Sequence, residues 1–407
     1  MKRIFMMVNQ PCYGESGGGH GIEYRLYRTN EKEHILDNIY FVFSDRVIKN
    51  GEEIGCLAKK KNIIEQSKFK IISNKLKPGF LRALKIQNDY NKICKYISEL
   101  NRKYIFSDED IYIFHDVKMA YAFTKCFTYK KCALVFHMQG SVYHEWKSFS
   151  GISSSSVQYV LNKVFIDAVK KMRYLCFPSK GAKESLIDSA PELNKNISKA
   201  IIKYIYNGVD CPDISSIKLP KEVKISEEDD DRLIFTTVAA LNSAKAVERI
   251  PQFLGQLKKH GNKIVWILVG NGIMAPLVEK EIVKNGIEKN TIWMKDFVPH
   301  DQVLKILSRS DFYILFHKQS IFDLSTLEAM HYGCIPVLTP VGGNNEMIIR
   351  ENGFFVNNFG DVRELEAAIQ NGVLDTMKQK NIELQEQMFG EEAMLKRYSD
   401  LCFELEK

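Results

Sequence analysis

Residues 312–343 read FYILFHKQSIFDLSTLEAMHYGCIPVLTPVGG. The apolar run 312–316 predicts a buried strand, and the loop after this run carries Asp323. A short helix is predicted to begin near Leu324 and to end before Gly333, because glycine commonly follows the last residue of a helix. The run 335–338 predicts the next strand. A strand, a helix and another strand in this order indicate parallel strands joined by a helical crossover.

The same alternation recurs along all 407 residues. Short apolar runs rich in β-branched and aromatic residues predict strands at 3–8, 39–43, 111–114, 133–136, 174–177, 201–205, 233–240, 264–269, 291–297, 312–316, 335–338 and 354–356. The acidic, turn-rich stretch 222–231 separates the first six runs from the last six. A chain of this length is too long for one hydrophobic core, so we expect two doubly wound α/β domains.

The domain boundaries are predicted from this division. Residues 1–205 are expected to form the first domain, and residues 206–380 the second. In residues 381–407 the apolar positions recur mostly at steps of three and four, which is typical of amphipathic helices. We expect these terminal helices to pack across the domain junction.

Cysteine usage and hydropathy exclude several classes of protein. The nine cysteines are scattered, odd in number and without a Cys-x-x-Cys pair, which argues against a zinc site or a disulfide framework. We therefore expect no metal site. No apolar run approaches the roughly 20 residues that a membrane-spanning helix needs, and the N-terminal run is too short for a signal peptide. The sequence thus favours a cytoplasmic protein.

The charges are divided unequally between the two halves of the chain. Residues 1–205 contain 34 Lys and Arg against 20 Asp and Glu, whereas residues 206–407 contain 23 against 30. A basic domain beside an acidic one indicates an anionic partner, such as a membrane, a phosphorylated lipid or a nucleic acid. The alternative interpretation is a surface that is simply rich in lysine.

Two loops of the first domain carry candidate functional residues, because ligands of open parallel sheets bind beyond the carboxyl ends of the strands. The loop 14–20 contains Gly17, Gly18 and Gly19, and glycines let a loop approach a ligand in front of a helix N-terminus. Glycines in such a loop also serve tight packing alone. His137 follows the strand at 133–136, where a solitary histidine is more often structural. That interpretation is stronger still for the pair 115–116.

The loop and helix at 317–331 carry the most informative pattern. If the helix begins near Leu324, its first amide groups can bind a diphosphate. Glu328 lies about one turn further along the helix and can accept hydrogen bonds from ribose hydroxyls. The stretch 342–346 then predicts another glycine turn that leads into a further helix.

Residues 327–337, LEAMHYGCIPV, followed by the glycines at 342–343, resemble the signature of family 4 retaining glycosyltransferases of the GT-B fold. Three further segments are similar to that family. The segment 206–210 resembles its interdomain crossing, 268–272 resembles its Val-Gly-Asp-Gly turn, and 295–299 lies where its backbone reads the donor base.

The resemblance implies two Rossmann-like domains that face each other across a cleft, with the acceptor bound by the first and the nucleotide-sugar donor, UDP-linked, by the second. It also implies retention of anomeric configuration without a protein nucleophile, a metal or another cofactor. By position, His137 matches the active-site histidine. The implied donor-binding residues are Gly18, Gly19, Lys245, Gly270, Asn271, Val298, Ser320, Phe322, Leu324, Ser325 and Glu328.

The chain departs from the family at two positions. Ser320 stands where the first glutamate of the Glu-x7-Glu pair is usual, and Ala240 stands where the arginine of the Arg-x4-Lys pair is usual. Lys245 is therefore the main cation left to neutralise a diphosphate leaving group. Asp323 is predicted to supply the missing carboxylate, so that His137, Asp323 and Lys245 are the predicted catalytic residues.

The segment 59–85 interleaves lysines and arginines with apolar and aromatic side chains. Such a segment can lie on anionic lipid, and it can equally be an ordinary solvated pair of helices. The resemblance favours the membrane, because enzymes of this family bind acceptors with the N-terminal domain and many extend lipid-linked sugars. A nucleic acid is not expected, since no recognisable reading motif accompanies the charge.

Together with these features, the resemblance implies a retaining hexosyltransferase that moves a sugar onto a saccharide acceptor in bacterial polysaccharide biosynthesis. The expected partners are a lipid-linked acceptor and the inner face of the cell membrane. Two alternatives remain: a catalytically degenerate partner subunit, and a sugar-nucleotide epimerase or phosphorylase of the same architecture. The sequence leaves open the sugar, the base, the acceptor, the linkage and the oligomeric state.

Overall fold

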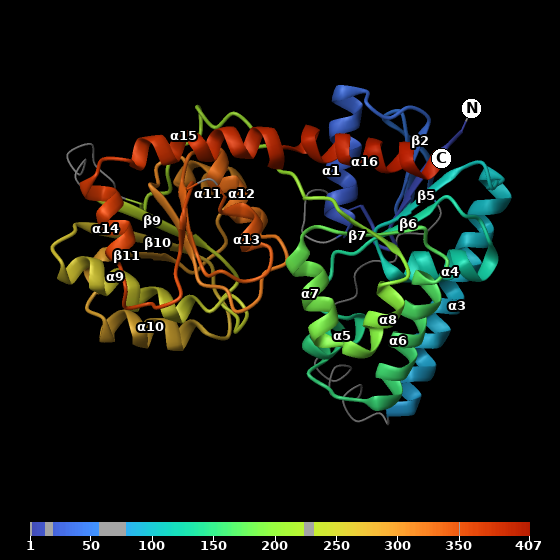
Figure 1. The fold of residues 1–407 in the computed structure, drawn as a ribbon, viewed down its shortest axis with the longest axis horizontal. Coiled ribbons are helices and arrows are strands. Elements are labelled where there is room, and N and C mark those ends of the chain that lie inside the picture. The colour runs from blue at the N-terminus through green and yellow to red at the C-terminus, as the bar shows by residue number, and fades with distance from the viewer. Residues whose placement is uncertain (1, 13–18, 57–78, 224–231, 350) are drawn as a thin grey trace. The chain divides into compact units, whose positions relative to one another are not determined.

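The computed structural model describes residues 2–12, 19–56, 79–223, 232–349 and 351–407. The chain divides into two compact units (Figure 1). Unit 1 contains Met1–Tyr206 and Met394–Lys407, and unit 2 contains Asn207–Ala393. The segment 381–407, predicted as one set of terminal helices, is therefore divided between the two units.

Unit 1 is built around an eight-stranded sheet in the order β4-β3-β2-β1-β5-β6-β7-β8. All neighbours pair in parallel except β3, which is antiparallel to both β2 and β4. The strands are β1 Ile4–Met7, β2 Ile39–Val42, β3 Arg46–Lys49, β4 Glu52–Cys56, β5 Ile111–Phe114, β6 Cys132–Val135, β7 Tyr174–Phe177 and β8 Ile201–Tyr204.

The hairpin of β3 and β4 is absent from the strands predicted from the sequence. Its turn consists of Asn50 and Gly51, which both have positive φ angles, 50° and 74°. Asn-Gly is the dipeptide that two-residue hairpins favour, because both central residues adopt this left-handed conformation. The signal was therefore present in the sequence, but the flanking strands are only four and five residues long.

Helices cover both faces of the unit 1 sheet (Figure 1). They are α1 Gly19–Glu33, α3 Gly79–Tyr104, α4 Val117–Cys126, α5 Val142–Ser150, α6 Ser155–Val169, α7 Lys180–Ser189, the 3-10 turn η1 Pro191–Leu193, α8 Asn194–Ile197 and α16 Glu391–Glu406. Four of these helices begin with a side-chain oxygen that accepts a hydrogen bond from a first-turn amide, which satisfies a backbone donor that the helix itself leaves free. The capping residues are Asp116, Ser141, Ser154 and Ser179.

The C-terminal helix α16 belongs to the core of unit 1. Its apolar residues Met394, Leu395, Tyr398, Leu401, Cys402 and Leu405 are buried together with side chains of α1 and of the central strands. Six apolar side chains on one face of a helix remove enough apolar surface from water to hold that helix on the sheet. The periodicity predicted for 381–407 thus serves unit 1 from residue 394 onward.

Unit 2 contains a wholly parallel six-stranded sheet in the order β11-β10-β9-β12-β13-β14. Its strands are β9 Leu233–Val238, β10 Ile264–Val269, β11 Thr291–Met294, β12 Phe312–Leu315, β13 Ile335–Leu338 and β14 Phe354–Phe355. Its helices are η3 Val247–Arg249, α9 Ile250–Lys259, α10 Ala275–Lys284, η4 Glu288–Asn290, α11 His300–Leu307, α12 Leu324–His331, α13 Asn344–Met347, α14 Arg363–Gln370, α15 Leu374–Leu384 and the π-helical turn η5 Gln385–Phe389.

Each of the twelve predicted strands overlaps an observed one, and the differences lie at the ends. The run 291–297 is the largest overestimate, because the strand stops at Met294, and the run 233–240 likewise extends beyond the end of its strand at Val238. Apolar residues after these points belong to loops at the carboxyl edge of the sheet. Hydrophobicity alone does not show where a backbone leaves the hydrogen-bonded ladder.

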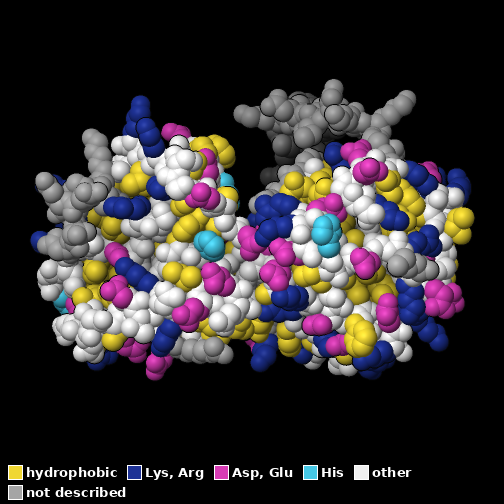
Figure 2. All heavy atoms as spheres, turned by 90° about the horizontal axis from the view of Figure 1, so that it is seen from above, with side chains coloured by type: hydrophobic (Ala, Val, Ile, Leu, Met, Phe, Trp, Pro, Cys, Tyr) yellow, Lys and Arg dark blue, Asp and Glu magenta, His cyan; other side chains and the backbone are white. Residues whose placement is uncertain are grey.

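Neither unit carries a single-sign surface on the face seen in Figure 2. Lys and Arg side chains are interspersed there with Asp and Glu over both units. Among the described residues, we find no helix that combines the length and the apolar character needed to cross a bilayer.

Candidate functional site

The carboxyl edge of the unit 2 sheet is formed by loops that pack backbone against backbone. Leu241 in the loop after β9 donates its amide to the carbonyl of Asn271 in the loop after β10, at 3.0 Å. Gly270 has a φ of +136°, and a Cβ atom there would overlap the carbonyl oxygen of Ala239. The Asn271 side chain bonds within this edge, to the amide of Gly272 and to the carbonyl of Lys295. Gly270 and Asn271, both predicted to bind the donor, therefore shape the loop.

Gly270→Ala is expected to lower the free energy of unfolding by about 2–5 kcal/mol, because it combines a strained backbone with a steric overlap. Gly261→Ala is the matched control, since Gly261 also has a positive φ, +92°, but faces open space. Gly261→Ala should lower the free energy of unfolding by about 1–2 kcal/mol, because only the backbone strain of a positive φ is involved. Urea denaturation of both variants measures the difference, and equal losses would contradict the role assigned to the close loop contact.

A second close contact joins the loop after β12 to the glycine turn before α13. The Gly343 amide donates to the Ser320 carbonyl at 3.0 Å, and a Cβ atom at Gly342 would overlap that same oxygen. Ser320 is 7% exposed, and its Oγ atom has no hydrogen-bond partner in the part of the chain that is described. A buried hydroxyl without a partner is uncommon and is suited to bind a polar group of a ligand.

The helix α12 begins at Leu324, as predicted from the sequence. Asp323 is its N-cap, and its Oδ2 atom accepts hydrogen bonds from the amide and the hydroxyl of Thr326 at 3.1 and 2.9 Å. An aspartate in this position satisfies a free amide and places negative charge at the positive end of the helix dipole. Phe322, just before the cap, is buried and its ring packs against Phe389 at 5.6 Å between centroids.

Lys245, His317 and Asp323 form a charged cluster at this helix N-terminus. The Lys245 Nζ atom lies 2.5 Å from Asp323 Oδ1 and 3.1 Å from His317 Nε2. His317 Nε2 lies 3.5 Å from the same carboxylate oxygen, and the Tyr313 hydroxyl donates to Oδ2 at 3.3 Å. Lys245, predicted from the sequence as the main cation left to neutralise a diphosphate, is thus held in an ion pair with Asp323.

The pKa shifts of the cluster follow from these contacts. Burial alone would raise the pKa of Asp323, but the Lys245 charge and the His317 hydrogen bond outweigh it and hold this pKa well below its usual range. Burial lowers the pKa of His317, although the contact with Asp323 opposes the shift. At neutral pH the cluster therefore holds a carboxylate and a neutral imidazole beside the Lys245 side chain.

His317 is not among the functional residues predicted from the sequence, and it lies at the centre of this cluster. It is 1% exposed and is also contacted by the Asn344 side chain at 3.4 Å. Its position directly after the strand 312–316 was the available signal, because that is where side chains reach the carboxyl edge of the sheet. Nothing in the local pattern indicated that its partner would be Lys245, 72 residues away.

Glu328 lies further along α12 and is 8% exposed. Its Oε1 atom is 3.0 Å from Nε2 of His300, the first residue of α11. Of the other residues predicted at this site, Leu324 and Ser325 occupy the first turn of α12, and Val298 packs at the border of the unit 2 core. Unit 2 therefore brings the predicted donor-binding residues of α12 together with Lys245.

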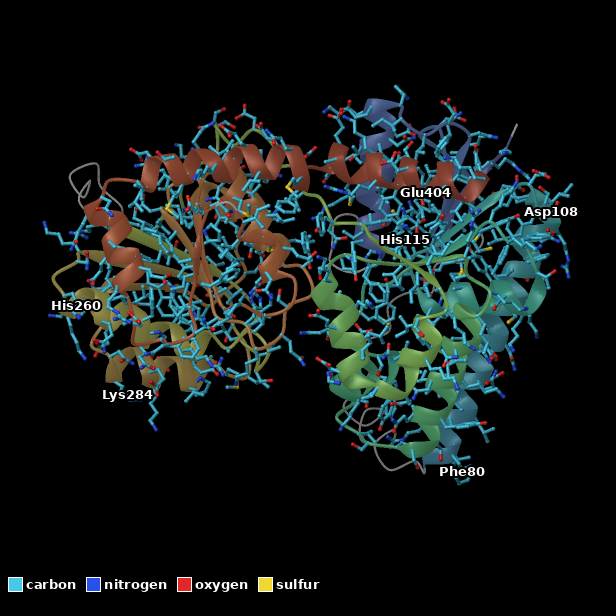
Figure 3. All side chains as sticks on the ribbon, in the orientation of Figure 1. Phe80, Asp108, His115, His260, Lys284 and Glu404 are labelled. Atoms are coloured by element: carbon cyan, nitrogen blue, oxygen red, sulfur yellow. The ribbon has the colours of Figure 1, made fainter. Side chains whose placement is uncertain are left out.

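In unit 1 the histidine predicted to be solitary has a partner. His115 follows β5 and His137 follows β6, and His115 Nδ1 lies 3.1 Å from His137 Nε2. Their rings are parallel, with centroids 5.3 Å apart, and Tyr398 stacks on His115 at 5.5 Å. Figure 3 shows His115 inside unit 1. Burial lowers the pKa of His137 to about 4. Burial, and to a smaller extent the neighbouring His137, lowers the pKa of His115 well below its usual range.

Both rings are therefore neutral at pH 7, and His137 can exchange neutral hydrogen bonds with a ligand. Of the glycines predicted in the first loop, Gly19 begins α1. Gly18 lies outside the described residues. Within the described residues we find no group of three or more His, Cys, Asp or Glu side chains arranged to hold a metal ion.

Unit 1 also contains a buried acid, Glu23, which interacts with the charge of Asp116, the residue after His115. Glu23 on α1 is fully buried, and neither carboxyl oxygen has a hydrogen-bond partner among the described residues. Burial raises the pKa of Glu23 well above its usual range, and the charge of Asp116 adds to the shift. Burial therefore favours the protonated, neutral form of the Glu23 carboxyl group.

Glu23→Gln is expected to stabilise unit 1 at neutral pH. Because the folded pKa of Glu23 is raised above its unfolded value near 4.5, its contribution to stability is complete below that pH and is lost as pH rises toward the folded pKa. The neutral amide avoids this loss, so the gain in unfolding free energy should grow with pH to about 1–3 kcal/mol. Thermal denaturation from pH 4 to pH 8 tests this, and a pH-independent difference would contradict it.

Comparisons with known proteins match the part of the chain that contains Lys245, His317 and Asp323. Residues 220–388 match the family model of glycosyl transferases group 1. An uncharacterized glycosyltransferase of Methanocaldococcus jannaschii is 29% identical over 163 residues, which are 38% of this chain and 40% of that protein. The alignment thus spans less than half of the curated relative.

Solved structures extend the similarity over both units. Sucrose-phosphate synthase from Thermosynechococcus elongatus has a TM-score of 0.64 at 15% identity, with 100% of this chain and 99% of that chain covered. Anabaena HepE in complex with UDP and glucose has a TM-score of 0.58 at 15% identity, with 99% and 100% covered. The structure of trehalose-6-phosphate synthase OtsA without ligand has a TM-score of 0.63 at 14% identity, and the alignment covers 98% of this chain and 99% of that chain. The chain therefore has the GT-B fold.

Proposed function

We propose that this protein is a glycosyltransferase that transfers a sugar from a nucleotide diphosphate donor to a saccharide acceptor. One observation carries the proposal: the N-terminus of α12 lies at the carboxyl edge of the unit 2 sheet with the Lys245 ammonium 2.5 Å from its N-cap carboxylate. Helix N-termini bind phosphate through free amides and the helix dipole. A lysine at the same point adds the charge that a diphosphate leaving group requires.

The finer features of the reaction are part of the same proposal. We propose a UDP-linked hexose as donor and retention of configuration, with a donor phosphate oxygen accepting the proton of the acceptor hydroxyl on the same face. Anabaena HepE was solved with UDP and glucose, and E. coli trehalose-6-phosphate synthase with a UDP-2-fluoro glucose, which supports a uridine nucleotide as the first to be tested. The independence from metals and the cytoplasmic location expected from the sequence stay predictions.

A lipid-linked acceptor in polysaccharide biosynthesis, and contact with an anionic membrane, complete the proposal. At the start of α3, Phe80, Leu81 and Leu84 are 57%, 42% and 61% exposed, and Lys85 lies beside them. Figure 3 shows Phe80 at one end of unit 1. Exposed apolar side chains beside cations suit an anionic lipid surface. The lysine-rich part of the predicted segment, 59–77, lies outside the described residues.

Glu328→Ala is expected to weaken donor binding about tenfold or more, because a carboxylate that accepts hydrogen bonds from ribose hydroxyls would be lost. Thermal shift measurements with a panel of nucleotide sugars, followed by calorimetry on the best ligand, check this. Binding raises the melting temperature in proportion to the logarithm of ligand concentration over Kd. No shift of the wild-type protein with any member of the panel would contradict the proposed function.

A non-catalytic partner subunit is the second candidate, and a specific observation favours it. Ser320 and Ala240 stand at positions where charged residues are usual in the family that the sequence resembles, and the remaining Lys245 is already paired with Asp323. Turnover separates the two candidates. A catalytic protein releases free nucleoside diphosphate from its donor, at least slowly by hydrolysis, whereas a partner subunit releases none.

A further inference from the structure

The pair His300 and Glu328 joins the first residue of α11 to the middle of α12. The imidazole Nε2 lies 3.0 Å from Oε1 of the carboxylate. The His300 side chain is 56% exposed, whereas that of Glu328 is 11% exposed. An exposed ring thus reaches inward to one oxygen of a nearly buried carboxylate.

This contact leaves the two carboxylate oxygens in different situations. Oε1 is engaged by His300, and no hydrogen bond to Oε2 is found among the described residues. Cys211 and Tyr332 interact electrostatically with Glu328. Burial raises the pKa of both groups, and the charge of Glu328 raises it further. The carboxylate therefore has one oxygen held in place and one open to a hydroxyl donor. A carboxylate with a fixed plane is the acceptor that a vicinal diol recognises best, because two hydroxyls then meet oriented lone pairs.

We infer that His300 is a positioning residue that holds Glu328 in the orientation that reads the ribose hydroxyls, so that the site prefers ribonucleotides to 2′-deoxyribonucleotides. The inference rests on the proposed function, because it takes Glu328 to face the ribose of the donor. His300 does not need to touch the nucleotide in this role. Its effect is to limit the rotation of a side chain whose alignment decides the strength of a charge-assisted hydrogen bond.

A purely structural role for His300 makes a different prediction. If the pair only tied α11 to α12, its loss would lower stability and would weaken ribo and deoxy ligands equally. The pair His260 and Glu366 is a matched control, since His260 Nδ1 lies 3.0 Å from Glu366 Oε1 and the His260 side chain is 48% exposed. Figure 3 shows His260 in unit 2.

The experiment measures Kd by calorimetry for UDP, GDP, ADP and CDP and for their 2′-deoxy forms, with the full-length protein at one pH. The wild-type protein is expected to bind its preferred ribonucleotide about tenfold or more tightly than the deoxy form, the effect of one hydrogen bond to a charged group. His300→Ala should reduce this ratio to about twofold, because an unrestrained carboxylate aligns poorly. His300→Gln, which can still donate to Oε1, should keep most of the ratio, and His260→Ala should keep all of it.

The outcomes separate the inference from the proposed function. If the wild-type protein binds none of the four ribonucleotides, both are wrong. If it binds one but does not discriminate against the deoxy form, or if His300→Ala leaves the ratio unchanged, the inference alone is overturned. An equal fall of the ratio in His260→Ala would also overturn it, because the effect would then not belong to the His300 contact.

Discussion

Lys245→Ala is expected to reduce kcat/KM for sugar transfer by a factor on the order of 10²–10³, the usual consequence of removing one group that stabilises developing charge. The structure adds a second expected effect. Asp323 is 7% exposed at its side chain, and its ammonium partner would be gone. Removing one partner of a buried ion pair costs about 3–5 kcal/mol, because the other charge stays buried. The variant should therefore be less stable as well as less active.

The pH dependence of stability identifies the cause of that loss. In the wild-type protein the pKa of Asp323 is lowered, so its stabilising contribution is present above the unfolded pKa and is lost as pH falls through the folded pKa. Without Lys245, burial raises the pKa of this carboxyl group instead. The difference in unfolding free energy between the two proteins should therefore shrink as pH is lowered from 7 to about 4.

Lys378→Ala is the control for the ion pair itself. Lys378 Nζ lies 2.7 Å from Asp311, which directly precedes β12 at the amino edge of the same sheet, opposite the cluster. Its loss should cost up to about 1 kcal/mol and leave transfer unchanged at temperatures where the variant is folded. Full transfer activity in folded Lys245→Ala would exclude Lys245 from the donor site.

Asp323→Asn is expected to lower kcat about 10²-fold while the affinity for nucleoside diphosphate rises. Asparagine is as good an N-cap as aspartate, so α12 should still begin at Leu324. The substitution removes a negative charge beside the proposed diphosphate site and releases the Lys245 ammonium to the ligand, which favours binding. The same carboxylate is predicted to replace the one missing at Ser320, so transfer should suffer.

Steady-state kinetics measure the expected fall in kcat, and calorimetry with the product nucleotide measures the expected rise in affinity. Asp361→Asn serves as a control, because the Asp361 side chain also accepts a hydrogen bond from a first-turn amide, that of Arg363 in α14. It should change neither quantity. Wild-type rates in Asp323→Asn would show that Asp323 is a structural cap and ion-pair partner only.

Local patterns predicted most of the fold because their physical causes are local. Strands such as Ile264–Val269 are continuous apolar runs, since both faces of a parallel sheet are buried. The start of α12 near Leu324 was predicted from the sequence, and in the structure Asp323 caps this helix through an amide three residues ahead. The short hairpin around Asn50 and Gly51 was missed because its strands are partly exposed and too short to show a period.

The candidate site was predicted only in part, because its contacts join distant segments. His115 and His137 were each judged alone, although they follow the neighbouring parallel strands β5 and β6 and so meet at one edge. The pairing of Lys245 with Asp323 depends on β9 lying beside β12, which are separated in the chain by β10 and β11. The sequence of neither segment indicates that β9 and β12 are adjacent in the sheet.

By itself, then, the sequence determined the order of strands and helices, the start of α12 and the chemical types of residue that follow each strand. These depend on periodicity and on hydrogen bonds within a few residues. Only the tertiary structure decided which carboxyl-end loops meet, and thereby that Lys245, His317 and Asp323 share one charged cluster. The reason is that strand order and burial are set by packing across the whole unit, and burial determines which charges must be paired and how far each pKa moves.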